Sequence, residues 1–352
     1  MLTNPSLHIQ IAHQTLFLLT GSFSESKHNP HLFLTARFVL ADTDAEPEVT
    51  HTYWQGHDDG YVRLFHDAHV PEEHRQEVLL SNGDRYQDTS LWELMYKRIS
   101  NAKSFIYIAG WSVFVPTRLI RRENEEEIPT LGELLKKKAD EGVEVVVMVW
   151  DEVMSVKYLM EAGLMGTHDE ETHRYFDGTK VNCVKFSRTG DMKKKSILKR
   201  IVFSSKQLFS VTHHQKTVVC DAPTRNQAKI CAFVGGIDLC DGRYDTADHC
   251  LYRRMLSYEY PASDYHNPGD NSFHAKNAPR QPWHDTHSYI EGTAAWHVLQ
   301  NFRERYNSQS SSKAPRLSNW TDTVGSETLA DREKDENWNV QIFRSIDSHV
   351  AA

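Results

Sequence analysis

Short apolar runs separated by helical patterns constrain this chain most. Residues 105–111 and 143–150 are almost continuously apolar and of strand length, as expected for strands buried on both faces of a sheet. Further strand patterns occur at 31–40, 61–65, 180–186, 216–220, 230–234 and 338–343, and helical patterns at 91–99, 131–141, 167–171 and 293–306. Capping residues support two helix starts, with Thr89 or Ser90 before the first and Thr130 before the second. From about residue 61 the alternation predicts an α/β fold, a layered mixed sheet flanked by helices on both sides.

Composition narrows the class of protein. The 352 residues are 39% hydrophobic and 25% charged, an ordinary globular balance, and the formal net charge is −8. This charge argues against broad nucleic-acid binding, although a local basic patch remains compatible with it. The five cysteines include no C-x-x-C pair, so we expect reduced thiols rather than a zinc or disulfide framework. Reduced thiols fit a cytoplasmic protein. No apolar stretch reaches the length of a membrane span, so we expect any contact with plasma or internal membranes to be peripheral.

One motif carries chemistry. His214, Lys216 and Asp221 fit the pattern H-x-K-x-x-x-x-D at a predicted strand, which places the histidine and the lysine on one face, with Asp221 just beyond the run. An imidazole can attack a phosphodiester, and a nearby ammonium can neutralise the phosphate oxygens. Asp221 would fix an imidazole tautomer, either that of His214 or that of a partner histidine. The alternative is that these are ordinary residues at a strand edge.

The segments around this motif resemble plant-type phospholipase D in the order in which that family has them. The resemblance covers roughly residues 50–347 and rests on the segments HDAHV (66–70), IYIAGWSV (106–113), TLGELLKKK (130–138), GLMGTHDEET (163–172), FVGGIDLCDGRYDT (233–246), PWHDTH (282–287) and WNVQIFRSID (338–347). It implies hydrolysis of phosphatidylcholine-like lipids to phosphatidate and a free headgroup, with His214, Lys216 and Asp221 as the first of two catalytic triplets.

The resemblance also implies binding residues. His214 and Lys216 would contact the lipid phosphate, and Gly235 and Gly236 would lie where the backbone approaches it; for the glycines the alternative is a plain tight turn. Calcium would be the cofactor, with Asp67, His249 and His284 at the family's ligand positions. Because calcium prefers oxygen ligands, a hydrogen-bonding role is the alternative for the two histidines.

The resemblance implies three regions. Residues 1–50 would be a remnant of an N-terminal lipid-binding β-sandwich with a linker, and residues 51–307 the first catalytic half. Residues 308–352 would be a loop and the truncated start of a second half. A second motif is missing, because His274 and Lys276 are followed by Gln281 where an aspartate is needed.

Several alternatives remain open at this point. A basic run ahead of the motif is either a solvated loop or a contact with anionic lipid, and it comprises Lys193, Lys194, Lys195, Lys199 and Arg200. With one motif, the chain is expected to be impaired on its own, unless a homodimer supplies the second histidine, as in single-motif phosphodiesterases and nucleases. The alternative from another class is a non-catalytic fragment that binds lipid or a partner.

Overall fold

The structure is a computed structural model that falls into two compact units, residues 1–56 and 57–352. It describes residues 6–11, 15–24, 31–40, 52–65, 79, 90–121, 128–152, 165–186, 212–223, 228–246, 249–252, 261, 264–267, 278–281, 283–309, 314–320 and 338–346.

The first unit contains a three-stranded antiparallel sheet. Its strands follow the chain order, β1 (Ser6–Ile11), β2 (Thr15–Ser24) and β3 (His31–Leu40). The strand predicted at 31–40 is therefore confirmed, whereas its origin in a lipid-binding β-sandwich stays a prediction.

The second unit is built on a mixed eight-stranded sheet, with strands in the order β11-β4-β10-β9-β8-β5-β6-β7. The strands are β4 (His57–Phe65), β5 (Phe105–Gly110), β6 (Glu144–Trp150), β7 (Asn182–Phe186), β8 (Lys216–Pro223), β9 (Ala228–Gly235), β10 (His287–Glu291) and β11 (Trp338–Val340). β5, β6 and β7 run parallel to one another, and every other neighbouring pair is antiparallel.

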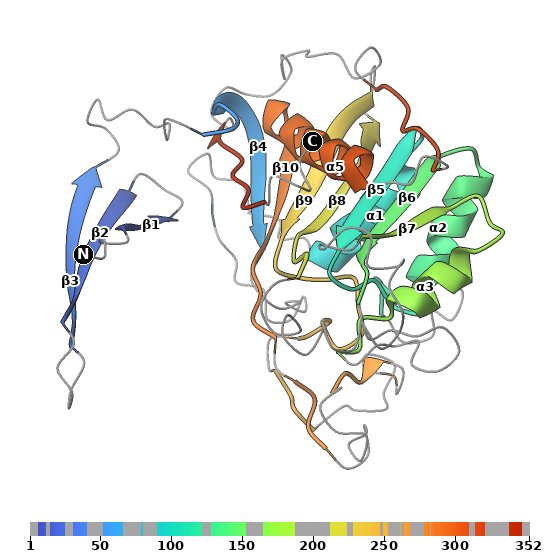
Figure 1. The fold of residues 1–352 in the computed structure, drawn as a ribbon, viewed down its shortest axis with the longest axis horizontal. Coiled ribbons are helices and arrows are strands. Elements are labelled where there is room, and N and C mark those ends of the chain that lie inside the picture. Colours follow the sequence, from blue (N-terminus) through green and yellow to red (C-terminus); the bar gives the residue numbers. More distant parts are fainter. Residues whose placement is uncertain are drawn as a thin grey trace, which may run out of the picture. The chain divides into compact units, whose positions relative to one another are not determined.

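Helices cover both faces of this sheet (Figure 1), as the sequence predicts. One face packs against α1 (Leu91–Asn101), α2 (Leu131–Asp140) and α3 (Asp169–Phe176) through a core that includes Ile106 and Ile108. The other face packs against α5 (Thr293–Gln309), where the ring of Tyr107 stacks on Phe302 at 5.0 Å. Burial on both faces explains why β5 and β6 are almost continuously apolar.

Local sequence signals set the ends of α2. The Thr130 hydroxyl accepts a hydrogen bond from Glu133 N, and the Glu133 carboxylate accepts one from Thr130 N, which completes a capping box. Gly142 follows with a φ of 94°, a conformation that glycine adopts without strain. Ser90 is the N-cap residue of α1 but makes no capping side-chain bond. No helix in the described part of the chain is long and apolar enough to cross a membrane.

Four central strands bring their ends together at one edge of the sheet. The first residue of β8, Lys216, pairs with Gly235 at the end of β9, and Gly235 pairs with His287 at the start of β10. On the other side, Thr217 pairs with Ala109 near the end of β5. Residues far apart in sequence therefore meet where the H-x-K part of the motif lies.

Candidate active site

His214 and Lys216 lie at this edge of the sheet. His214 is exposed just before β8, with its ring 6.1 Å from that of Trp111, whereas Lys216 is only 5% exposed. Although much of the residue is exposed, partial desolvation of the ring, followed by the positive charge of Lys216, lowers the pKa of His214 from its ordinary value. The neutral imidazole, which is the nucleophilic form, is thereby favoured near neutral pH.

The carboxylate that partners Lys216 is Asp238. Asp238 Oδ2 lies 3.1 Å from Lys216 Nζ, and both side chains are buried. Asp238 Oδ1 accepts hydrogen bonds from the backbone N–H groups of Trp111 and Ser112, at 2.9 and 3.2 Å. These bonds fix the carboxylate, and the carboxylate holds the ammonium group beside His214. Burial lowers the pKa of Lys216, and the ion pair with Asp238 opposes that shift.

Asp221, the third residue of the motif, lies elsewhere. β8 continues to Pro223, so Asp221 belongs to the strand rather than lying beyond it, which corrects the predicted strand end. It lies five residue steps along the strand from Lys216, a distance of roughly 16 Å at ~3.3 Å per residue. Its fully buried carboxylate accepts hydrogen bonds from the backbone N–H groups of Lys103, Ser104 and Phe105. These contacts anchor the start of β5 and do not orient His214.

Gly235 and Gly236 have a packing role. A Cβ on Gly235 would lie 2.4 Å from His287 Nδ1, and one on Gly236 would lie 2.3 Å from Asp285 Oδ1. Gly236 N also donates a hydrogen bond to Thr286 O at 2.9 Å. The two glycines therefore let the segment 285–287 approach β9 closely, which places Asp285 and His287 at the motif.

His287 is a site residue that motif reasoning missed. It is 4% exposed, and its Nδ1 lies 3.4 Å from Ile237 N, which leaves Nε2 as the protonated nitrogen. Burial, followed by the charge of Lys216, lowers the pKa of His287 to about 3. The ring is therefore neutral, and among the described residues its buried Nε2 has no hydrogen-bond partner. Its only sequence signal is its place in PWHDTH, where His284 is the residue expected to act.

Charges of both signs surround the motif. Arg243 and Asp285 both influence the charge states of His214 and Lys216, in opposite directions. The guanidinium of Arg243 lies 3.9 Å from the ring centre of Trp283 and donates a hydrogen bond to Asp241 O. A mixed group of this kind can hold an anionic phosphate next to the histidine.

The residues expected to bind calcium are brought together in part. The rings of His249 and His284 lie 4.3 Å apart, and His249 Nδ1 lies 2.8 Å from Asp245 Oδ2. Asp245 Oδ2 also pairs with Arg280, and Asp245 Oδ1 accepts a hydrogen bond from Thr246 N. Since calcium prefers oxygen ligands, the two imidazoles alone do not fit it. A fit depends on Asp67, which lies outside the described residues.

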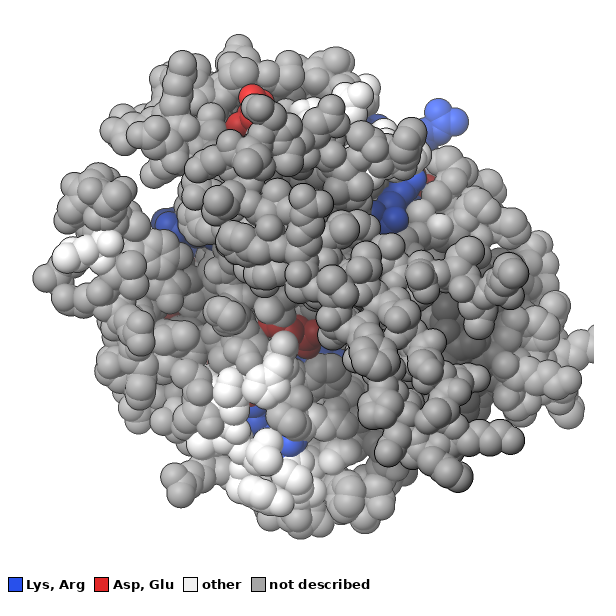
Figure 2. All heavy atoms as spheres, turned by 90° about the vertical axis from the view of Figure 1, so that its left-hand side faces the viewer, with Lys and Arg blue, Asp and Glu red and all other residues white. Residues whose placement is uncertain are grey.

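The predicted lipid contact also lies outside the described residues, because residues 193–200 are not among them. On the face drawn in Figure 2, the described Lys and Arg side chains lie in separate small groups, with acidic side chains between them.

Comparison with known proteins assigns the family. The family model described as Phospholipase D matches residues 98–352, more than half of the chain and including the whole motif. The chain belongs to the phospholipase D family. It is 43% identical over 315 residues to phospholipase D alpha 1 of Oryza sativa subsp. japonica, and 41% identical over 317 residues to phospholipase D alpha 1 of Arabidopsis thaliana. The resemblance to plant phospholipase D is thereby confirmed.

The match covers most of this chain but less than half of each of the two plant phospholipases. It covers 87% of this chain but 38% of each of the two relatives. Among solved structures, the chain is similar to a phospholipase D family member, Nuc from Salmonella typhimurium, with a TM-score of 0.34 and 11% identity. That similarity covers 73% of this chain and 99% of the Nuc chain.

Proposed function

We propose that this chain forms a phospholipase D half-site that cleaves phosphatidylcholine-like lipids through a phosphohistidine on His214. The observation that carries the proposal is an exposed imidazole with a lowered pKa, beside a buried lysine that Asp238 holds in place. Membership of the phospholipase D family supports the reaction class.

The covalent step follows from these positions. A ring nitrogen of His214 attacks the lipid phosphorus, and a N–P bond forms as the bond from phosphorus to the headgroup oxygen breaks. Lys216 neutralises the non-bridging oxygens as negative charge grows on them in the transition state. Water then attacks the same phosphorus, which releases phosphatidate and restores the imidazole.

The leaving headgroup oxygen needs a proton from an acid on the opposite side of the phosphorus. The 352 residues contain one H-x-K-x-x-x-x-D motif, so in an assembly of these residues alone we assign the acid to a histidine of a second copy. His287 is a poor acid, because its folded pKa of about 3 leaves it neutral.

Calcium and lipid contact are further parts of the proposal. Asp67 would supply the oxygen ligand that the pair His249 and His284 lacks. The basic run 193–200 would contact anionic headgroups, at about 1 kcal/mol per basic side chain near a charged bilayer. No catalytic step depends on either. With this lipid contact the chain would act at a membrane surface in the cytoplasm.

A headgroup-release assay on phosphatidylcholine vesicles tests the proposal, with the His214→Ala variant beside the unchanged chain. We expect release by the unchanged chain at concentrations where it dimerises and none by the variant. Equal release by both proteins would remove His214 from the reaction.

A further inference from the structure

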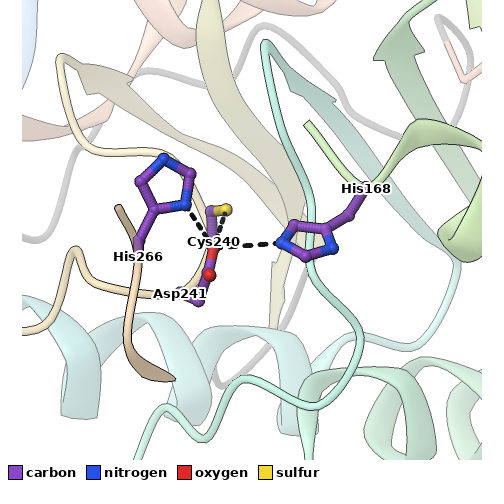
Figure 3. A group of neighbouring side chains, drawn as sticks. All are labelled: His168, Cys240, Asp241 and His266. Carbon is purple, nitrogen blue, oxygen red and sulfur yellow. Dashed lines mark hydrogen bonds and ion pairs between the residues drawn. The ribbon is translucent and has the colours of Figure 1, made fainter. Parts of the chain in front are cut away.

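Four side chains with metal-binding atoms meet beside the candidate active site. His168 precedes α3, Cys240 and Asp241 follow β9, and His266 lies in a later loop; one donor atom from each lies within 4.8 Å of the others. The two imidazoles approach the Cys240–Asp241 pair from opposite sides (Figure 3). Cys240, Asp241 and His266 are buried, and the side chain of His168 is 12% exposed.

Two of the three distances from Asp241 Oδ1 fall in the range for ligands of a single small ion, and the third, to Cys240 Sγ, is a hydrogen-bond distance that would lengthen when the thiol loses its proton. Asp241 Oδ1 lies 3.3 Å from His168 Nε2, 3.1 Å from His266 Nδ1 and 2.7 Å from Cys240 Sγ. Ligands about 2.0–2.3 Å from a tetrahedral zinc ion lie roughly 3–4 Å from one another.

The backbone is shaped to bring these groups together. His168 has a φ of 54°, a left-handed conformation that is uncommon for a residue other than glycine. Gly242 has a φ of 71°, and a Cβ there would lie 2.7 Å from the Cβ of His266. Ser112 Oγ lies 2.9 Å from Cys240 Sγ and 2.8 Å from Thr167 O, so it links the cysteine to the residue before His168.

Groups around the cluster match the surroundings of metal ligands. His168 Nδ1 lies 2.8 Å from Glu171 Oε2, which directs the other ring nitrogen toward the cluster. A carboxylate behind a histidine in this way is common in zinc sites, where it fixes the ring and raises its basicity. The ring of Phe114 covers the same imidazole at 4.1 Å between centroids and limits access of water.

We propose that His168, Cys240, Asp241 and His266 form a structural site for a divalent transition metal of the zinc class. Two imidazoles, a thiolate and a carboxylate are the donors that zinc accepts, whereas calcium takes oxygen ligands. On binding, Cys240 and any protonated imidazole of the cluster release their protons to solvent.

The site would join three separate chain segments. Cys240 lies two residues after Asp238, which holds Lys216, so a bound ion would stiffen the loop that positions the lysine. The spacing of the cysteines in sequence does not indicate zinc, because the four ligands come from three different parts of the chain. The proposal does not depend on the reaction proposed for His214.

The competing arrangement is a hydrogen-bonded group in which Asp241 accepts from its three neighbours and no ion binds. Cobalt(II) separates the two, because a thiolate ligand gives a sulfur-to-cobalt charge-transfer band and tetrahedral coordination gives intense visible bands. The experiment uses the 352-residue chain, stripped with a chelator and then titrated with Co²⁺ or Zn²⁺.

We expect one ion per chain, a charge-transfer band, and a thermal unfolding midpoint that rises with Zn²⁺. Cys240→Ala should remove the band, and Glu171→Gln should weaken binding about 10–100-fold by loosening His168. Cys183→Ala, a cysteine of β7 outside the cluster, is the matched control and should keep the band. His249→Asn should also keep it, since that residue belongs to the separate histidine pair.

X-ray absorption at the zinc edge of the unchanged chain gives a readout that needs no variant to fold. We expect one sulfur neighbour at about 2.3 Å and nitrogen or oxygen neighbours at about 2.0 Å. A stripped chain that binds neither ion, a bound zinc without a sulfur neighbour, or a cobalt band that survives Cys240→Ala would each overturn the proposal.

Discussion

Replacing Asp221 tests whether the last residue of the motif has a structural or a chemical role. Its carboxylate is fully buried and accepts hydrogen bonds from Lys103 N at 2.9 Å, Ser104 N at 3.0 Å and Phe105 N at 3.2 Å. Asp221→Ala leaves three backbone N–H groups without an acceptor. Each such group destabilises the folded state by about 1–3 kcal/mol when it is buried away from water. Phe105 is buried, whereas water can reach Lys103 and Ser104, so we expect a loss of about 3–5 kcal/mol in the free energy of unfolding.

The conservative change Asp221→Asn refines the test. An amide keeps one acceptor oxygen but turns its NH2 group toward Lys103 N, so we expect a smaller loss of about 1–2 kcal/mol. Asp140→Asn is the control, because the Asp140 side chain is 70% exposed and its ion pair with Lys180 lies on the surface. That substitution should change stability by less than about 0.5 kcal/mol.

Urea unfolding followed by tryptophan fluorescence measures these losses, and NMR titration of the histidine rings reports on His214. We expect the His214 titration to be unchanged in Asp221→Asn, because the carboxylate lies at the far end of β8. The reasoning fails if Asp221→Ala is as stable as the unchanged chain, or if Asp221→Asn moves the His214 titration.

Three further predictions concern the candidate site. Lys216→Met should lower any headgroup release on the order of a hundredfold, measured beside Asp140→Asn, and unchanged turnover would contradict its charge-stabilising role. His287 has a pKa of about 3 in the folded protein, below its ordinary value of 6.5. The contribution of the neutral ring to the free energy of unfolding is therefore complete above about pH 6.5 and falls as the pH drops toward 3. Between pH 7 and 5, His287→Gln should therefore abolish about 2 kcal/mol of pH-dependent destabilisation in urea unfolding, and an unchanged pH dependence in that variant would contradict a buried neutral ring. Calorimetry should show weaker calcium binding for Asp67→Ala, and identical affinities would exclude Asp67 as a ligand.

The sequence predicts the layers of the fold because burial of a strand or a helix face requires apolar residues at regular positions in the local sequence. The apolar runs at 105–110 and 144–150 match strands buried on both faces, and Thr130 with Glu133 forms the capping box that begins α2. The order of the strands could not be predicted, since β11 pairs with β4 across more than 270 residues of sequence. Periodicity reports which face of a strand is buried but not which strand lies beside it.

The motif predicts the histidine and lysine but not the carboxylate that pairs with them. The two-residue spacing at the start of β8 brings His214 close to Lys216, whereas Asp238 reaches Lys216 only through the register of β8 and β9. The same register places Asp221 at the far end of β8, where its contacts are with the backbone at the start of β5. Spacing in the sequence therefore does not identify Asp238 as the carboxylate beside Lys216.

The specific activity of the 352-residue chain toward phosphatidylcholine across a dilution series tests whether two copies of the chain must combine to complete the site around His214. The series spans monomer and dimer, and mass spectrometry of the quenched protein locates the covalent adduct. We predict that activity rises as dimers form and that a phosphatidyl adduct appears on His214, with neither seen in His214→Ala. Headgroup release that persists in His214→Ala, an adduct on another residue, or full activity from a demonstrated monomer would contradict the account.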